Sequence, residues 1–297
     1  MVHRIAILIL ALGILGCSVK KEHIPASFAQ LAALSDEQLA KVDIALMNLL
    51  CAEGLPGADN LDIPECLKTL DQWAMLAKRN EKNDFLQFQK DPEAYDRSES
   101  LFKAVNLGLT IKDDLKCGYN MQLIVSGALT DMASSRFFRN SQDLFIHGLI
   151  QGKRGSCSSL PVLTVAVGRR CGYPLKLVTT KGHLFCRWDE GKIRHNIEMA
   201  CPGVDSKPDS YYMSWPLKTS DAERKVEKHL QSLTPREEFG VFCSIRGSCL
   251  MESGRLADAK EAFNQTLRAI PESVYAKQMI RIIDDRIDQG KRHDRSG

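Results

Sequence analysis

The sequence predicts an α+β fold, in which a helix with a cysteine at its start packs on an antiparallel sheet. Three observations predict this. The segment from Ser158 to Arg170 is small and mostly apolar, as expected for a buried helix. The segment from His183 to Glu198 alternates like two strands joined by a short polar turn. The regions before and after this centre follow helical periodicity, which predicts an N-terminal helical region and a C-terminal helical hairpin.

Cys157 stands at the start of the predicted buried helix. Gly155 and Ser156 precede it, and Ser156 is a suitable N-cap, while Pro161 lies where a missing N–H costs least. Backbone N–H groups and the helix dipole at such a position favour a thiolate and can hold an oxyanion. A small buried cysteine that packs the helix start fits the same pattern, since free cysteine is among the most buried residue types. The local sequence leaves both interpretations open.

The predicted hairpin supplies a base for this cysteine. With the turn centred on Glu190 and Gly191, His183 lies opposite Glu198, and Asn196 is one diagonal step away. Strand alternation places these three side chains on one face and leaves the other face largely apolar. Cysteine, histidine and a carboxamide or carboxylate, in this chain order, can make a thiolate nucleophile with an oriented base. The arrangement depends on the register, because a slip by one residue would remove it.

Three stretches of the chain resemble a known family. RGSCSSLPVLTVAVGRRCGYPLKLV from Arg154, KGHLFCRW from Lys181 and NLLCAEGLPG from Asn48 are similar to the SirB-type bacterial branch of the transglutaminase-like superfamily. The resemblance covers roughly Ser35 to Pro216. It implies a papain-like, transglutaminase-like core and a Cys-His-Asp type of triad.

The resemblance implies roles for particular residues. Cys157 corresponds to the nucleophile, His183 to the base and Asn196 to the third member, where the superfamily usually has Asp. Asparagine can orient an imidazole, as in Cys-His-Asn proteases, but cannot neutralise the imidazolium. Glu198 is the alternative third member, directly across the predicted ladder. Gln151, six residues before the cysteine, has the spacing of an oxyanion glutamine in papain-like proteases, although a surface-loop glutamine fits this position as well.

The N-terminus reads as a targeting segment. A short basic start is followed by an apolar run of 12 residues, Ile5–Gly16, which is too short to span a bilayer because a span needs about 20. The letters ILGC at 14–17 resemble a bacterial lipobox, so residues 1–16 are expected to be a signal peptide and Cys17 the lipidation site. An ordinary signal peptide with a chance cysteine, or an uncleaved anchor, remains an alternative. Ser18 resembles outer-membrane sorting, which predicts a lipid-anchored protein of the bacterial cell envelope, on the periplasmic face of the outer membrane.

Composition and residue spacing limit the kinds of partner and cofactor that we expect. The chain has 297 residues, enough for about two domains. Its formal net charge of +3 and the lack of a basic stripe with interleaved aromatics argue against nucleic acid. Ten cysteines are present, but no CxxC pair or Cys/His cluster has metal-ligand spacing, so neither a metal nor a cofactor is expected. Cys17 and Cys157 have the roles given above, and the sequence does not determine which of the other cysteines form disulfides with each other.

The expected domain organisation has four parts: the signal peptide at 1–16, a lipid-anchored tether at 17–34, a transglutaminase-like domain with N-terminal helices at 35–216, and a helical tail at 217–297. Within the domain, helices are expected from Ser35 to Leu50, from Ile63 to Lys78 and from Cys117 to Ala133.

The tail resembles a tetratricopeptide repeat. A helix-turn-helix pattern covers Glu238 to Ala269, and several residues stand near the spacings of the repeat: Gly247, Gly254, Ala259, Phe263 and Pro271. A lone repeat cannot bury its own apolar face. The tail is therefore predicted to dock on the preceding domain or to bind a protein partner.

Two classes of function follow from these features. The first is a cysteine-dependent amide hydrolase or transamidase that acts on exported peptides, proteins or cell-wall material. The second is a non-catalytic binding or scaffold lipoprotein of the same fold, whose repeat tail holds a protein partner. The cysteine and histidine at matching positions favour the first class, and Asn196 in place of Asp keeps the second open.

Overall fold

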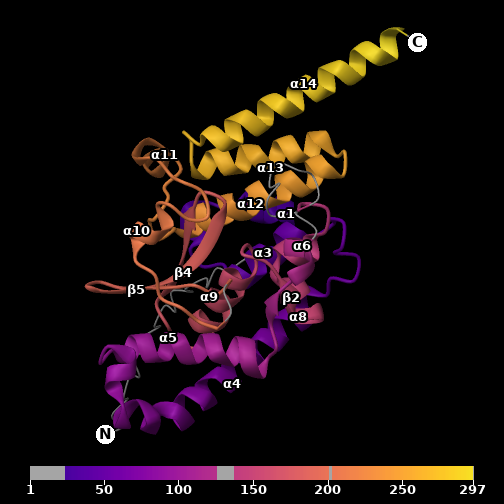
Figure 1. Ribbon diagram of the computed structural model, residues 1–297. Coiled ribbons are helices and arrows are strands. Elements are labelled where there is room, and N and C mark those ends of the chain that lie inside the picture. The colour runs from indigo at the N-terminus through magenta and orange to yellow at the C-terminus, as the bar shows by residue number, and fades with distance from the viewer. Residues whose placement is uncertain (1–23, 126–136, 201–202, 297) are drawn as a thin grey trace, which may run out of the picture.

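The computed structural model describes residues 24–125, 137–200 and 203–296, and the chain is an α+β protein with a small sheet and helices at both ends (Figure 1). The expected signal peptide and Cys17 lie outside the described residues. The N-terminal region is helical throughout, with α1 (Phe28–Ala32), α2 (Asp36–Leu39), α3 (Ile44–Ala52), α4 (Ile63–Lys90), the 3₁₀ helix η1 (Pro92–Tyr95), α5 (Glu99–Leu109) and the π-helical turn η2 (Thr110–Asp114). Within the described ranges, no helix combines the length and apolarity needed to cross a membrane.

Two of the expected N-terminal helices have different bounds. The helix expected from Ser35 to Leu50 is divided, because Asp43 caps a new helix by accepting hydrogen bonds from the backbone N–H groups of the first turn of α3. The helix expected to end at Lys78 continues to Lys90, since no glycine or proline interrupts it before Pro92.

The segment that leads to Cys157 differs most from expectation. It contains β1 (Gly118–Tyr119), α6 (Met121–Val125), α7 (Ser141–Leu144), α8 (Ile146–Gly152) and β2 (Arg154–Gly155). The helix expected from Cys117 is wrong at its start, because Gly118 and Tyr119 pair in parallel with Arg154 and Gly155. This pairing brings Tyr119 beside the chain just before Cys157.

The central layer consists of α9 (Leu160–Arg170) and a three-stranded antiparallel sheet of β3 (Leu175–Thr180), β4 (His183–Glu190) and β5 (Ile193–Ile197), in the order β3-β4-β5. Helix α9 is buried along most of its length and packs on β3 and β4. The inward side chains of β4, Leu184, Cys186 and Trp188, are buried. Burial of each large apolar side chain here contributes about 1.5–3 kcal/mol. The predicted helix-on-sheet arrangement is therefore present.

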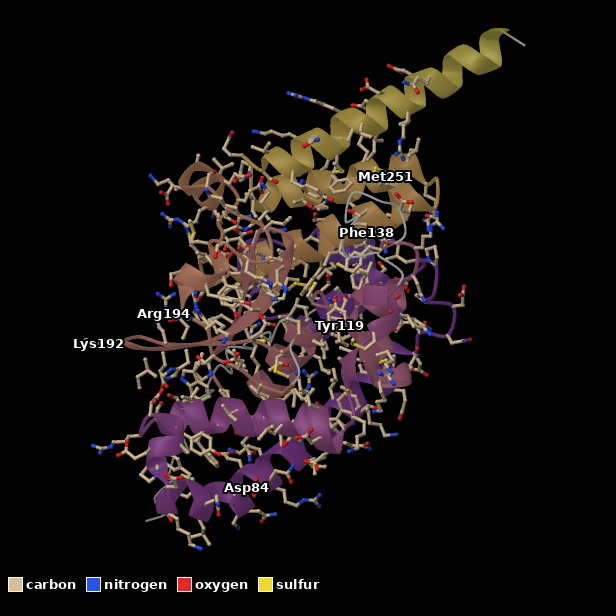
Figure 2. All side chains as sticks on the ribbon, in the orientation of Figure 1. Asp84, Tyr119, Phe138, Lys192, Arg194 and Met251 are labelled. Carbon is tan, nitrogen blue, oxygen red and sulfur yellow. The ribbon has the colours of Figure 1, made fainter. Side chains whose placement is uncertain are left out.

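The register of the β4–β5 hairpin differs by two residues from the predicted one. Glu190 pairs with Ile193 and Arg187 with Asn196, so the turn residues are Gly191, with φ +62°, and Lys192. Figure 2 shows this tip, with Lys192 and Arg194, projecting from the body. Because the shift is an even number of residues, each side chain stays on its predicted face while its cross-strand partner changes.

The C-terminal region comprises α10 (Asp209–Tyr212), α11 (Asp221–Val226), α12 (Pro235–Glu252), α13 (Leu256–Ala269) and α14 (Val274–Ser296). Helices α12 and α13 form the predicted helical hairpin. Gly247 allows their close approach, since a Cβ there would lie 2.8 Å from the Phe263 ring. Helix α14 follows α13, and its C-terminal end extends away from the body (Figure 1).

The tail packs on the rest of the chain, as the sequence predicts. Phe239 and Phe242 of α12 belong to the same buried cluster as residues of α3 and α9. At the edge of this interface Arg169 Nη1 donates to Glu238 Oε2 at 3.0 Å, and Arg236 Nε donates to Asp36 Oδ1 at 2.7 Å. The tail and the sheet-bearing region thus share one hydrophobic core.

Candidate functional site

Cys157 lies on a serine-rich turn between β2 and α9. The backbone N–H groups of Ser159 and Leu160 donate to the carbonyl oxygen of Ser156, at 3.2 and 3.0 Å. The side chains close the turn, because Ser158 N donates to Ser156 Oγ at 3.1 Å and Ser156 N to Ser159 Oγ at 3.0 Å. Helix α9 begins only at Leu160, with Ser159 as N-cap, so the expected N-cap role of Ser156 is wrong. The turn, rather than the helix start itself, holds the thiol.

His183 is the first residue of β4 and connects two groups of the site. Its Nε2 lies 2.8 Å from Glu198 Oε2, and its imidazole is hydrogen-bonded to the thiol of Cys157. Because Glu198 engages Nε2, Nδ1 is the ring nitrogen that remains for the sulfur. The structure therefore brings the predicted cysteine and histidine together and places the alternative third residue, Glu198, on the far side of the ring.

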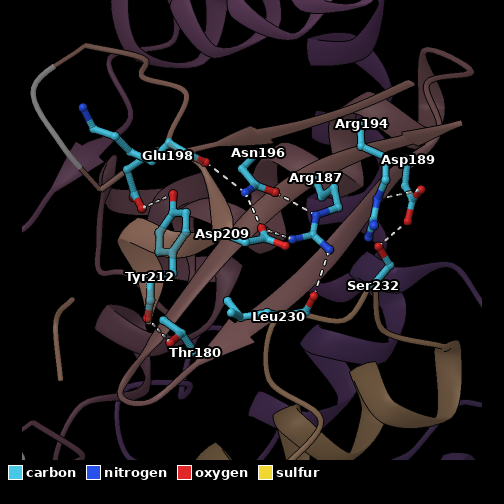
Figure 3. A network of polar contacts seen from close by, with 11 residues as sticks. Thr180, Arg187, Asp189, Arg194, Asn196, Glu198, Asp209, Tyr212, Leu230 and Ser232 are labelled. Atoms are coloured by element: carbon cyan, nitrogen blue, oxygen red, sulfur yellow. Dashed lines mark hydrogen bonds and ion pairs between the residues drawn. The ribbon is translucent and has the colours of Figure 1, made fainter. Parts of the chain in front are cut away.

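Glu198 follows β5, and donors from described residues hold both of its carboxylate oxygens. Besides His183, the Tyr212 hydroxyl donates to Oε2 at 3.1 Å (Figure 3), and the backbone N–H of Ala200 donates to Oε1 at 2.7 Å. Burial alone would raise the pKa of Glu198, but the hydrogen bonds and the histidine charge outweigh it and lower that pKa. The group is therefore a carboxylate at neutral pH.

The protonation of His183 follows from the same contacts. Burial disfavours the imidazolium and by itself would lower the pKa of His183. The hydrogen bonds to Cys157 and Glu198, together with their negative charges, outweigh burial and raise this pKa to about 9. At neutral pH the ring therefore carries a proton on each nitrogen, and the thiol lies beside a cation.

The predicted contact between Asn196 and His183 is wrong. Asn196 Oδ1 accepts from Arg187 Nε at 2.7 Å, and its Nδ2 donates to Asp209 Oδ1 at 2.7 Å and to the Lys207 carbonyl at 2.9 Å (Figure 3). Arg187, whose side chain is 1% exposed, also pairs with Asp209 at 2.6 Å. The register is the physical reason, because it sets Asn196 opposite Arg187 and leaves Glu198 one diagonal step from His183.

Gln151 makes its described contact elsewhere, with the loop before α4. It lies on the exposed side of α8, where its Nε2 donates to the carbonyl of Asn60 at 2.9 Å. The expectation that it forms an oxyanion site is therefore corrected to a surface contact between α8 and the loop before α4.

Tyr119 is a site residue that the sequence reasoning missed. Its hydroxyl accepts from the backbone N–H of Cys157 and contacts the thiol, and burial together with this thiol raises the pKa of Tyr119. The parallel pairing of Tyr119 with Gly155 places it there. No local signal marks a two-residue strand, and the surrounding pattern predicted a helix instead.

Aromatic side chains from the segment after β5 close the site. The Trp215 ring meets the His183 ring edge to face, with 4.7 Å between centroids, and Tyr212 stacks on Phe185 at 3.9 Å. Trp215 is 36% exposed, whereas Cys157 is 8%, His183 6% and Glu198 4% exposed. The fully buried Tyr212 closes the core, and the more exposed Trp215 covers the outer side of the His183 ring.

The described residues include no group of three or more His, Cys, Asp or Glu side chains placed to hold a metal ion. Comparison with protein-family models, with curated proteins and with solved structures gives no match. The site itself consists of a thiol, an imidazole and a carboxylate in series, with a phenol beside the thiol.

Proposed function

We propose that this protein is a thiol enzyme with a transglutaminase-like, papain-like core, which hydrolyses or transfers amide bonds of peptides or cell-wall material. One observation carries the proposal: His183 bridges the thiol of Cys157 and the carboxylate of Glu198. A structural cysteine needs no such partner, whereas a nucleophile needs a base, and the base needs an orienting group.

The reaction would proceed through an acyl-enzyme. Cys157 Sγ attacks the carbonyl carbon of the amide, and the thiol proton resides on His183. When the C–N bond breaks, His183 gives this proton to the departing amine. Water or a second amine then attacks the thioester, loses a proton to His183 and releases the thiol. Glu198 holds the Nε2–H and stabilises the imidazolium in each half of the reaction.

Tyr119 is the residue we assign to the oxyanion. Its hydroxyl lies at the thiol and at the backbone N–H of Cys157, where the carbonyl oxygen of a tetrahedral intermediate would lie. A phenolic O–H that donates to that oxygen takes the place of the expected glutamine, and the N–H of Cys157 holds the phenol in position. Trp215 supplies an exposed aromatic surface beside His183, against which a planar amide can pack.

The proposal is tested by treating the full chain with less thiol-reactive electrophile than there are thiols, so that the most reactive cysteine is labelled first. Iodoacetamide is expected to label Cys157 in preference to Cys171, although Cys171 is the more exposed thiol. His183→Ala should lower the rate at Cys157 by about 100-fold and leave Cys171 unchanged. Cys171→Ala serves as the matched control and should not affect labelling of Cys157. Release of ammonia or of amine from glutaminyl and peptidyl amides, present in the wild type and lost in Cys157→Ala, would establish the reaction.

A specific observation also supports a second function, a non-catalytic binding or scaffold protein. Cys157, His183 and Glu198 are each less than one tenth exposed, and such burial fits a catalytically inactive site whose residues stabilise the fold. A protein partner would then bind the tail. Equal labelling of Cys157 with and without His183, with no turnover of any amide, would favour this function over the enzyme.

We further propose the envelope location that the leader predicts, with Cys17 lipidated and the membrane contacted through that anchor. The motif at 14–17 supports the proposal. Growth with an alkyne fatty acid should label the wild type and not Cys17→Ser. Labelling that survives the substitution would refute the anchor.

A further inference from the structure

Two buried cysteines from distant parts of the chain meet between α3 and α12. Cys51 lies near the end of α3 and Cys243 lies in the middle of α12, and both are 0% exposed. The two thiols are within hydrogen-bonding contact of each other. The helices that carry them pack directly together, one from the N-terminal region and one from the tail.

The other described cysteines have different surroundings. The main electrostatic neighbours are carboxylates for Cys66, a lysine for Cys117, Lys78 and Glu81 for Cys171, and Arg246 with Glu252 for Cys249. Cys186 lies against Pro161, to whose carbonyl its thiol donates at 3.2 Å. The contact of Cys51 with Cys243 is therefore a particular pairing and not a general crowding of sulfur in the core.

Arg246 fixes the position of the two helices at this point. One turn after Cys243, its Nη1 donates to the carbonyl of Cys51 at 2.9 Å and to that of Glu53 at 2.7 Å. Its guanidinium also lies over the Phe28 ring, 4.4 Å from the centroid. These bonds satisfy carbonyl groups at the end of α3 and hold α12 in the register that brings the thiols together.

We propose that Cys51 and Cys243 are a disulfide-forming pair, which covalently joins the C-terminal tail to the N-terminal helices when the chain folds under oxidising conditions. The two thiols give up two protons and two electrons and form one S–S bond. The electrons go to a disulfide oxidant, a small-molecule or protein disulfide, which is reduced to two thiols through a mixed-disulfide intermediate.

The burial of the pair determines when the bond forms. Burial raises the pKa of the Cys243 thiol well above its ordinary value, so this thiol is a poor nucleophile in the folded protein. The mixed disulfide must therefore form before α12 has fully docked on α3. Once closed, the bond lies where neither a reductant nor a competing thiol reaches it.

The bond would strengthen an interface that already exists. A disulfide between these positions closes a loop that contains the whole central layer, and long loops lose the most conformational entropy in the unfolded state. The tail would then open only together with the core. This inference does not depend on the proposed chemistry at Cys157, and a failure of either leaves the other standing.

The experiment refolds the full reduced chain in a mixture of reduced and oxidised glutathione. Non-reduced proteolytic mapping should recover a peptide pair joined at Cys51 and Cys243, lighter than the separate peptides by two hydrogen atoms. The midpoint of thermal unfolding of the oxidised protein should exceed that of the reduced protein by about 5–15 °C.

Variants keep the test independent of any packing loss. In Cys51→Ala and in Cys243→Ala the difference between oxidised and reduced midpoints should vanish, whatever the absolute stability of each variant. Cys249→Ala, which changes an equally buried thiol on α12, should retain it. The proposal is overturned if mapping joins either cysteine to another residue. It is also overturned if both remain free thiols in the refolded, oxidised protein.

Discussion

The face of the β4–β5 hairpin that carries His183 holds two buried polar clusters. They differ in whether the central cation can lose its proton. In one, His183 lies between a thiol and the Glu198 carboxylate, and its imidazole can gain or lose a proton, with a pKa raised to about 9. In the other, Arg187 binds Asn196, Asp209 and the Leu230 carbonyl, and its charge is fixed (Figure 3). The first arrangement suits proton transfer, and the second suits a permanent structural brace.

This difference shows that position on one face of a sheet does not assign a role. Asn196 and Glu198 are two residues apart and point the same way, yet they belong to different clusters. The contact is decided by which residue stands across the ladder, and a two-residue change of register exchanges these neighbours without moving either side chain to the other face. The two clusters make separate sets of contacts. If they are also separate in function, a substitution in one should leave the property that depends on the other unchanged.

The largest expected effect is on stability and comes from the Arg187 cluster. Arg187→Met should lower the free energy of unfolding by about 2–4 kcal/mol, because it leaves Asn196 and part of Asp209 without a charged donor. Arg194→Met, on the same face near the hairpin tip, should change it by less than about 0.5 kcal/mol, since that ion pair is half exposed. Urea denaturation measures both. Similar losses in the two variants would contradict the assigned role of the cluster.

The next effect is on thiol chemistry and comes from the His183 cluster. Glu198→Gln should slow alkylation of Cys157 near neutral pH by about tenfold or more, because a neutral amide does not stabilise the imidazolium. Asn196→Ala should leave the rate within about twofold although it reduces stability. If Asn196→Ala slowed alkylation more than Glu198→Gln, Asn196 would be the orienting group after all.

The pH dependence of stability should separate the clusters further. The folded-state pKa of His183 is raised to about 9 from an ordinary 6.5. Its contribution is therefore fully present below about pH 6.5 and is lost as the pH rises through about 9. The stability advantage of the wild type over His183→Gln should shrink across that window.

The matched control for this pH series is Asn196→Ala, because a carboxamide does not ionise in this pH range. Its stability loss should stay constant from about pH 6.5 to 9. A loss that follows pH in the same way as that of His183→Gln would mean that the two clusters titrate as one unit.

The smallest effect is expected at the outer wall. Trp215→Ala removes the ring that covers His183 and should let bulky electrophiles label Cys157 a few-fold faster, while small ones change little. The ratio of the rates for a maleimide of large size and for iodoacetamide measures this. A uniform loss of reactivity for both reagents would show that Trp215 orients His183 and does not act as a wall.

The sequence identified the elements whose signals are local. The small, apolar run before Arg170 predicted a buried helix, and alternation after His183 predicted a hairpin with the correct faces. The predicted turn was one residue off and the register therefore two residues off, because both Glu190-Gly191 and Gly191-Lys192 offer a glycine for the tight turn. Strand β3, from Leu175 to Thr180, was not predicted from the sequence.

By itself the sequence determined the central helix, the hairpin faces, the helical tail and the pairing of a cysteine with a histidine as candidates, since each depends on periodicity or on spacing within one segment. Tertiary structure alone decided that Glu198 and not Asn196 meets His183, that Tyr119 reaches Cys157, and that Cys51 meets Cys243. Each of these contacts joins side chains through strand register or helix packing. Strand register and helix packing depend on how all side chains of the core pack together, and no local sequence pattern encodes this packing.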